Sequence, residues 1–332
     1  MIDLSERAKA LVAEGKGVLA ADESTPSADK RLALYGIAGD PETRRQFRAL
    51  FLEAPGAEEF LSGVILYSET AAQAGDSGAP FPALLAAKGI APGIKVDEGT
   101  EPMPESPAEL ITKGLIGLPE RLAPYAAQDF TFAKWRAVVR IDGDRLPTPQ
   151  AIVENAKRLA AYAADAQKAG IVPFLEPEML YDGAHSRLRA RAVLEDTLKA
   201  LFAALADQSV DISGVILKTA MVLSGKGSGR MDTPEEVAQD TVEVLIACVP
   251  KQVPGIVFLS GGQTPDQATD NLRAIAARGA SAGAPWPLTF SYARALQEEA
   301  LAAWKGKPEN VPAAREAFLA RMRAVSAASR GL

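Results

Sequence analysis

The sequence of 332 residues contains only one cysteine and one histidine. Cys248 cannot form a disulfide within the chain, and its apolar neighbours predict that it lies in the core. His185 is expected to be a structural hydrogen-bonding residue. With one residue of each type, a metal site built from histidines and cysteines is excluded, and no metal is expected. No apolar run reaches the ~18 residues that a membrane-spanning helix needs, so no membrane partner is expected.

An excess of positive charge is also missing, because 36 lysines and arginines face 42 aspartates and glutamates, for a formal net charge of −6. Proteins that bind nucleic acid nonspecifically usually carry a basic surface, so no nucleic-acid partner is expected. Residues 1–7 carry charges of both signs without an apolar segment, and no secretion signal is expected there. We therefore predict a cytoplasmic globular protein.

Eight short apolar runs alternate with helix-length segments along most of the chain. This alternation predicts a parallel sheet, and eight repeats fit a closed (β/α)8 TIM barrel. A doubly wound open sheet is the alternative, but it would not need ionisable groups at so many strand ends. We expect one domain over residues 1–332, with a helix in the first dozen residues and a closing helix at 312–325. The predicted strands are 18–21, 61–66, 92–94, 132–139, 171–175, 212–217, 256–259 and 287–290.

One of these runs, residues 212–217, leads directly into Lys218. Lysine is almost never fully buried without a reason. One interpretation is that Lys218 extends out of the strand end and makes an ion pair. The other is that burial and neighbouring positive charge favour a neutral amine, which can attack a carbonyl and form a Schiff base. We interpret the Gly-rich segment 224–230 that follows as a mobile active-site loop.

Charged residues at other strand ends favour the chemical interpretation. Glu176 and Glu178 are two residues apart, so on an extended chain they point to the same side. A carboxylate pair beside an amine suits acid and base catalysis, although an acidic turn is the alternative. Lys134 and Lys95 would add positive charge if they share the barrel mouth, and each could otherwise be a surface lysine.

A phosphate site is predicted after the last two strands. Gly261 and Gly262 precede a helix that Thr264 caps, so backbone N–H groups are available at a positive helix end. In TIM barrels the corresponding loops often bind phosphate. Arg294, three residues after Ser291, could complete the site with its guanidinium. A tight turn is the alternative role for the two glycines.

Taken in order, these motifs resemble the class I, Schiff-base-forming fructose-bisphosphate aldolases over almost the whole chain. Each motif is short, but their order along the chain is specific. They are Gly-Lys-Gly at 15–17 with Ala-Asp-Glu-Ser-Thr at 21–25, Gly-Ile-Lys-Val-Asp at 93–97, Phe-Ala-Lys-Trp-Arg at 132–136, Glu-Pro-Glu at 176–178, Leu-Lys at 217–218, Phe-Leu-Ser-Gly-Gly-Gln at 258–263 and Leu-Thr-Phe-Ser-Tyr at 288–292.

The resemblance implies catalytic roles. Lys218 would form the Schiff base with the ketose C2 carbonyl. Glu176, supported by Glu178, would act as acid and base in carbinolamine dehydration and at the C4 hydroxyl. Lys134 would position that hydroxyl, and Asp22 would orient the substrate and assist carbon–carbon cleavage. The protonated imine would be the electron sink, so no cofactor is expected.

The resemblance also implies the ligands of the two phosphates and a homo-oligomer, commonly a tetramer. Ser260, Gly261 and Arg294 would hold the phosphate on C1, whereas Ser24, Ser27 and Lys95 would contact the phosphate on C6. The remaining expected substrate- or phosphate-binding residues are Arg136, Gly262 and Ser291.

The chain departs from the animal and plant members at a few positions. Thr219-Ala220 stands where they have Pro-Asn after the lysine, and Ala293 and Pro26 each replace a glycine. Those members end in a tyrosine that assists proton exchange at C3, whereas this sequence ends in Ser-Arg-Gly-Leu. We expect another group to do that task or the step to be slower.

We expect a glycolytic and gluconeogenic aldolase that reversibly cleaves fructose 1,6-bisphosphate, a small-molecule sugar phosphate, to dihydroxyacetone phosphate and glyceraldehyde 3-phosphate. A class I aldolase for a related ketose phosphate is one alternative. A barrel that binds sugar phosphates as a scaffold without turnover is the other, but the intact set of Lys218, Glu176, Lys134 and Asp22 argues against it.

Overall fold

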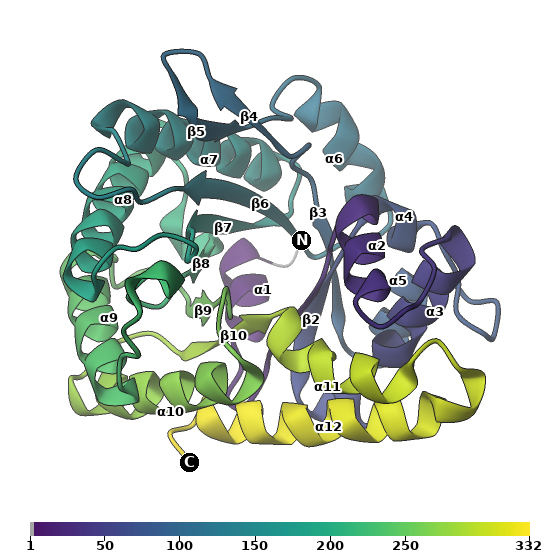
Figure 1. Ribbon diagram of the computed structural model, residues 1–332. Helices are drawn as coiled ribbons and strands as arrows, with labels where there is room; N and C mark the ends of the chain where they lie inside the picture. Colours follow the sequence, from purple (N-terminus) through teal and green to yellow (C-terminus); the bar gives the residue numbers. More distant parts are fainter. Residues whose placement is uncertain (1–2) are drawn as a thin grey trace.

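The computed structural model describes residues 3–332 and has a closed barrel of eight parallel strands with helices around it (Figure 1). The strand order is β1-β10-β9-β8-β7-β6-β3-β2, and β1 also pairs with β2. This arrangement confirms the predicted (β/α)8 TIM barrel. Met1 and Ile2, part of the segment in which no secretion signal is expected, lie outside the described residues.

The barrel strands coincide with the eight apolar runs, and nearly all of their residues are buried. They are β1 (Gly17–Ala21), β2 (Leu61–Leu66), β3 (Ala91–Lys95), β6 (Phe132–Val139), β7 (Val172–Met179), β8 (Ile216–Thr219), β9 (Ile256–Phe258) and β10 (Leu288–Tyr292).

The helices surround the barrel, and short 3-10 turns occur in some of the connections. The helices are α1 (Leu4–Ala10), α2 (Thr25–Ala33), α3 (Pro41–Leu52), α4 (Ser68–Ala71), α5 (Phe81–Ala87), α6 (Leu118–Ala127), α7 (Pro149–Lys168), α8 (Arg187–Asp207), α9 (Pro234–Cys248), α10 (Pro265–Ser281), α11 (Arg294–Trp304) and α12 (Val311–Ala328). The 3-10 turns are η1 (Ala57–Glu59), η2 (Ile212–Gly214), η3 (Lys226–Ser228) and η4 (Pro308–Asn310).

Local sequence signals explain where several of these helices begin. Thr148, Thr233 and Thr264 each accept a hydrogen bond from a backbone N–H in the first turn of the following helix, and each is followed by proline. Such a cap satisfies one of the N–H groups that a helix start leaves unpaired, and proline has no N–H to satisfy. These caps fix the length of the connections and therefore the register of strand and helix.

Helix α1 closes the end of the barrel at which the strands begin. Arg7 donates to the Gly170 carbonyl just before β7, and Ser62, near the start of β2, donates to the Leu11 carbonyl over 2.6 Å. In Figure 1, α1 lies at the centre of the ring of strands. The carboxyl ends of the strands are therefore the open end. Residues around α1 pack on the interior side chains Val18, Ala20, Ile65, Phe132, Phe174, Ile216 and Val257.

Phe132 is, together with Phe174, the largest of these interior side chains, and its neighbours make room for it. Its ring lies 4.6 Å from the ring of Phe174. A Cβ added to Gly93 would lie 2.3 Å from the Phe132 ring, and one added to Gly63 would lie 2.8 Å from it. These distances are below van der Waals contact, so β2 and β3 need glycine at these two positions.

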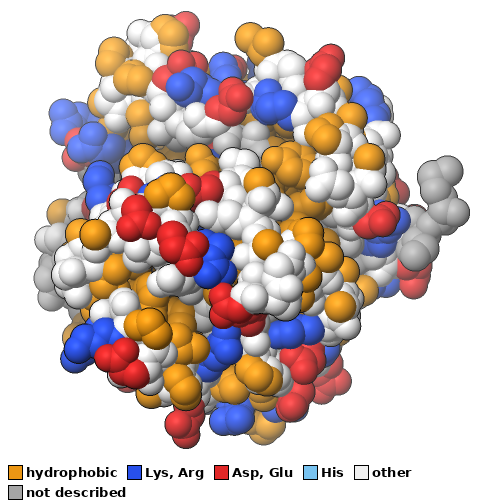
Figure 2. Space-filling view, turned by 90° about the vertical axis from the view of Figure 1, so that its right-hand side faces the viewer, with side chains coloured by type: hydrophobic (Ala, Val, Ile, Leu, Met, Phe, Trp, Pro, Cys, Tyr) orange, Lys and Arg blue, Asp and Glu red, His pale blue; other side chains and the backbone are white. Residues whose placement is uncertain are grey.

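A second apolar layer lies between the strands and the outer helices. The closing helix predicted at 312–325 is α12, which packs on α3, α10 and α11. Phe318 of α12 meets Phe51 of α3 edge to face, with ring centroids 4.9 Å apart. Among residues 3–332, no helix has the combination of length and hydropathy that crossing a bilayer requires. On the face shown in Figure 2, acidic and basic side chains are interspersed.

Some local predictions were wrong. The Pro-rich segment 101–107, expected to be a loop, belongs to an antiparallel hairpin of β4 (Thr100–Met103) and β5 (Ser106–Thr112). The 3-10 turn η2 occupies residues 212–214, so the strand before Lys218 is shorter than expected. β7 extends through Glu176 and Glu178, whereas the strand was expected to end at 175. Cys248, expected in the core, is half-buried at the end of α9 and packs against the core from its edge.

Candidate functional site

A cavity of about 1230 Å³ opens at the carboxyl ends of the barrel strands. Every predicted site residue except Gly262 contributes to its lining. From the N-terminal half these are Asp22, Ser24, Ser27, Lys95, Lys134 and Arg136, and from the C-terminal half Glu176, Glu178, Lys218, Ser260, Gly261, Ser291 and Arg294.

Four charged side chains form a continuous chain of ion pairs in the cavity. The Lys218 Nζ lies 3.0 Å from Glu176 Oε1, and the other carboxylate oxygen of Glu176 lies 2.9 Å from Lys134 Nζ. Lys134 Nζ is also 2.6 Å from Asp22 Oδ2. Each side chain is at most 8% exposed. Lys218 thus makes an ion pair, as the first interpretation of the strand predicts, but inside the cavity.

Strand alternation explains why these four side chains meet. Residues two apart on a strand point to the same side, and each of the four follows an interior apolar residue by two positions. Asp22 follows Ala20, Lys134 follows Phe132, Glu176 follows Phe174 and Lys218 follows Ile216.

The ion pairs determine the charges of the site. Burial alone would raise the pKa of Asp22, but Lys134 and then Lys218 hold that pKa at about 2. Burial acts against the charged form of Glu176 too, yet the same two lysines keep its pKa below the usual value. Burial would lower the pKa of Lys134, and Asp22 and Glu176 raise it well above the ordinary value. The two carboxylates and Lys134 are therefore charged at neutral pH.

Arg136 and Lys95 each have an acidic partner at the edge of the same cavity. Arg136 forms an ion pair with Glu178. Lys95 Nζ donates to the Asp97 carbonyl over 2.9 Å and pairs with the Asp97 carboxylate, which also accepts from the Gly99 N–H over 3.1 Å. Asp97 belongs to the Gly-Ile-Lys-Val-Asp motif, but it was not predicted as a site residue. Asp97 lies two residues beyond Lys95, the last residue of β3, and this spacing could have indicated that the two side chains meet.

The two predicted phosphate ends lie at helix starts. Ser24 precedes α2 and its Oγ is 3.0 Å from Ser27 Oγ. Arg294 is the first residue of α11. The hydroxyl oxygen of Ser291 is buried and has no hydrogen-bond partner among the described residues. Backbone N–H groups at a helix start attract anions, so both ends can hold a phosphate.

Gly262 lies outside the cavity lining. Its φ of +75° is a conformation that favours glycine, and a Cβ at this position would lie 2.0 Å from the Tyr181 ring. The tight turn that was the alternative interpretation therefore accounts for this residue. Gly261, in contrast, faces the cavity.

The departures at Thr219, Ala220, Ala293 and Pro26 fall in different surroundings. Thr219 and Ala220 are buried behind Lys218, at 0% and 6% exposure. Pro26 and Ala293 both line the cavity. The substitutions after the lysine therefore affect packing, whereas the other two face the site.

The Gly-rich segment 224–230 does not line the cavity, so its interpretation as an active-site loop was wrong. The Gly225 N–H donates to the His185 carbonyl over 2.8 Å, and the Gly227 N–H donates to the Gly183 carbonyl over 2.9 Å. A Cβ on Gly225 would lie 2.1 Å from the Gly183 carbonyl oxygen. This close backbone packing, rather than a need for mobility, explains the glycines.

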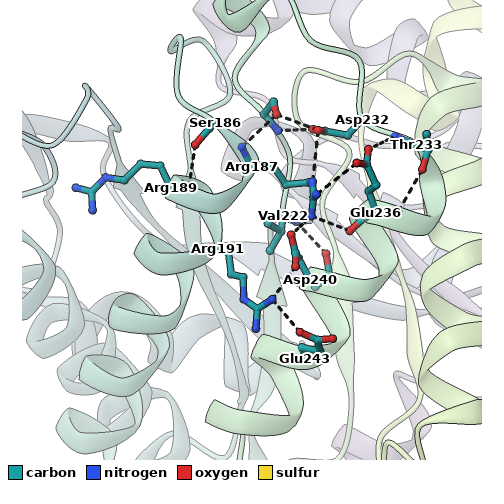
Figure 3. Close-up of polar contacts among 12 residues, drawn as sticks. Ser186, Arg187, Arg189, Arg191, Val222, Asp232, Thr233, Glu236, Asp240 and Glu243 are labelled. Atoms are coloured by element: carbon teal, nitrogen blue, oxygen red, sulfur yellow. Dashed lines mark hydrogen bonds and ion pairs between the residues drawn. The ribbon is translucent and has the colours of Figure 1, made fainter.

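An ion-pair network fixes the same segment from the side (Figure 3). Asp232 accepts from the Ser224 N–H over 2.6 Å and from its hydroxyl over 3.0 Å. Arg187, at the start of α8, lies among Asp232, Glu236 and Asp240 (Figure 3). The connection after Lys218 is therefore held to both α8 and α9.

In the part of the chain that the structure describes, no group of three or more His, Cys, Asp or Glu side chains is arranged to hold a metal ion. Asp22, Asp97, Glu176 and Glu178, which line the cavity, have lysine or arginine partners instead.

Comparison with known proteins gives a consistent result. The family model described as fructose-bisphosphate aldolase class-I matches residues 3–332. The fructose-bisphosphate aldolase of Drosophila melanogaster is 46% identical over 330 residues, which is 99% of this chain and 90% of that protein. Fructose-bisphosphate aldolase C of Rattus norvegicus is 45% identical with the same coverage. The aldolase from Plasmodium falciparum, solved in complex with TRAP and a small-molecule inhibitor, has a TM-score of 0.96 and 42% identity, covering 99% of this chain and 94% of that one.

Proposed function

The chain belongs to the class I fructose-bisphosphate aldolase family, which cleaves fructose 1,6-bisphosphate reversibly through a lysine Schiff base, and we propose that Lys218 is the lysine that reacts. The observation that carries this assignment is the buried chain of Asp22, Lys134, Glu176 and Lys218 at the open end of the barrel.

Our candidate for proton exchange with Lys218 is Glu176. A proton passed from Lys218 to Glu176 across 3.0 Å leaves a neutral amine and a carboxylic acid. The amine adds to the C2 carbonyl, and the acid returns its proton to the carbinolamine hydroxyl, which leaves as water. The product is a protonated imine on Lys218, beside a carboxylate that is again charged.

The positive charges of the imine and of Lys134 then assist cleavage of the carbon–carbon bond. A base removes the proton of the C4 hydroxyl, the C3–C4 bond breaks, and its electron pair moves to the iminium nitrogen. The aldehyde leaves, and an enamine remains on Lys218. Glu176 is our candidate for that base, with Asp22 orienting the substrate. Lys134, which keeps its positive charge, stabilises the developing negative charge on the C4 oxygen.

We assign the C1 phosphate to the end of the cavity at Ser260, Gly261, Ser291 and Arg294. The C6 phosphate belongs at the opposite end, with Ser24, Ser27, Lys95 and Arg136. The imine serves as the electron sink, so the proposed reaction uses no metal or other cofactor. We further propose that residues 1–332 form one domain and that the protein works in the cytoplasm as a homotetramer.

The test is reduction with borohydride in the presence of fructose 1,6-bisphosphate, followed by peptide mass mapping. We expect a single reduced adduct on Lys218. Lys218→Arg should give no adduct and no turnover but should still bind the substrate. Lys134→Arg is the matched control, because it keeps the amine of Lys218 and should still give an adduct. An adduct on another lysine would reject the assignment of Lys218. Loss of activity with EDTA would reject the metal-independent mechanism.

A further inference from the structure

The two helices that carry the opposite phosphate ends of the proposed site contact each other through polar side chains. α2 begins after Ser24, and α11 begins with Arg294. From α2, Arg31 Nη1 donates to Gln297 Oε1 of α11 over 2.6 Å. Figure 1 shows α2 beside α11 on the same side of the barrel. The relative position of the two helix starts therefore depends on this contact.

Gln297 also links α11 to the strand that carries Asp22. Its side chain is fully buried, and Nε2 donates to the Ala20 carbonyl of β1 over 3.1 Å. The amide thus accepts from one element and donates to another. Buried amides rarely remain without partners because an unmet hydrogen bond is costly. One side chain therefore connects α11, α2 and β1.

The guanidinium on the other side of this contact is fixed as well. Arg31 Nη1 donates to Glu23 Oε1 over 2.7 Å, and Glu23 also pairs with Arg48 of α3. Arg48 is 2% exposed, and its Nη2 donates to the Glu23 carbonyl over 3.0 Å. If the amide of Gln297 is removed and α11 shifts, Arg31 stays with Glu23 and does not move with α11. Without the amide, the buried contact that sets the spacing between the two helices is lost.

A second contact lies just beyond the end of α2. The hydroxyl of Tyr35, just after α2, donates to the Glu298 carbonyl of α11 over 3.5 Å. This longer bond involves a side chain that is only partly buried. It acts between the same two helices, but it should contribute less than the buried amide.

We propose that Gln297, through Arg31, sets the spacing between the two phosphate-binding helices and thereby the preference for a ketose bisphosphate over a ketose 1-phosphate. This inference rests on the assignment of the phosphates above. A bisphosphate engages both helix starts at once, so it is sensitive to their separation. A 1-phosphate uses only the end at Arg294. Small misplacements of binding groups are costly when two ends must be satisfied together.

The test is Gln297→Met, which keeps the length of the side chain and removes both polar contacts. We expect the ratio of kcat/KM for fructose 1,6-bisphosphate to kcat/KM for fructose 1-phosphate to fall about tenfold, mainly through KM for the bisphosphate, because the buried contact between the two helices is lost. Activity with fructose 1-phosphate should change about twofold or less. Tyr35→Phe should lower the same ratio by a smaller factor.

Gln167→Met is the matched control. Gln167, in α7, bonds to the backbone of Asp211 with both its amide atoms, over 2.7 and 3.0 Å. Loss of these two hydrogen bonds should lower the thermal midpoint of unfolding. It should leave the ratio of the two kcat/KM values unchanged, because Gln167 does not connect the two phosphate-binding helices.

Equal loss of activity toward both substrates in Gln297→Met would mean a merely structural role and would overturn the inference. An unchanged ratio in Tyr35→Phe would do so if Gln297→Met does not fold. Failure of the proposed function is recognised separately, because the unaltered protein would then give no borohydride adduct on Lys218.

Discussion

Asp22 offers the most direct test of the electrostatics of the site. The pKa of its carboxyl falls from the ordinary 3.8 to about 2 in the folded protein, because Lys134 and Lys218 outweigh the effect of burial. This lowering corresponds to about 2 kcal/mol of stability. The stability that the ionised carboxyl contributes is fully present above the pKa of the unfolded chain, near pH 4. It is lost as the pH falls toward the pKa of the folded protein, about 2. Asp22→Asn should therefore be less stable at pH 7 by about 2 kcal/mol.

The assay is urea unfolding of both proteins at pH 7 and pH 3, followed by circular dichroism. The gap between the two free energies of unfolding should be largest at pH 7 and about half as large at pH 3, where the carboxyl of the unfolded chain is mostly protonated. Asp76→Asn is the control, because Asp76 pairs with Arg45 at the surface with a side chain that is 70% exposed. It should change stability little.

Two results would refute this reasoning. One is a gap for Asp22→Asn that stays constant between pH 7 and pH 3, since the stability would then not come from the ionised carboxyl. The other is an Asn variant more stable than the unaltered protein at pH 7, because burial would then outweigh the attraction of the lysines.

Two further predictions follow from other buried carboxylates. Glu176→Gln should remove turnover almost completely and lower the free energy of unfolding by about 3–5 kcal/mol, because Lys134 and Lys218 lose their shared carboxylate. Stopped assays and denaturant titration measure the two effects, and near-normal turnover would contradict the role of Glu176. Asp232→Ala should speed amide hydrogen exchange at Ser224, because both hydrogen bonds from Ser224 to Asp232 are lost. Borohydride trapping on Lys218 should persist. Exchange that stays slow would show that the network in Figure 3 does not hold the segment.

The barrel could be predicted because each strand is an apolar run followed by polar residues at a mouth. The same alternation placed Asp22, Glu176 and Lys218 at one end. The alternation could not show which carboxylate pairs with which lysine. Lys134 on β6 reaches Asp22, just after β1, only because the closed barrel brings the ends of these two strands to the same mouth. That pairing is a property of closure and not of any local segment.

Two of the mistaken predictions share a cause, namely contacts with distant parts of the chain. The Pro-rich hairpin looks like a loop locally, but Glu109 within it is buried and accepts from the Thr148 N–H over 2.8 Å. The glycines at 224–230 suggest mobility, yet Asp232 and Arg187 fix the segment. Tertiary contacts override local preferences in both cases.

The roles of Glu23 and its partners were missed for the same reason. Arg48 reaches Glu23 from α3, and Gln297 reaches Arg31 from α11. Neither arginine nor glutamine stands in a motif that points to the cavity. Only the three-dimensional structure reveals that a residue adjacent to Asp22 is held from two helices.

The pairing of the first barrel strand with the last has a consequence during synthesis. Val18 of β1 pairs with Ser291 of β10, and Thr289 bonds to the Lys16 carbonyl across 273 residues of sequence. At ordinary translation rates the ribosome needs on the order of tens of seconds to make the intervening chain. During that time one edge of β1 has no partner, and the interior side chains that pack around α1 are added one strand at a time. A nascent chain arrested after β9 would therefore expose two strand edges and should be a substrate for chaperones or a source of aggregates.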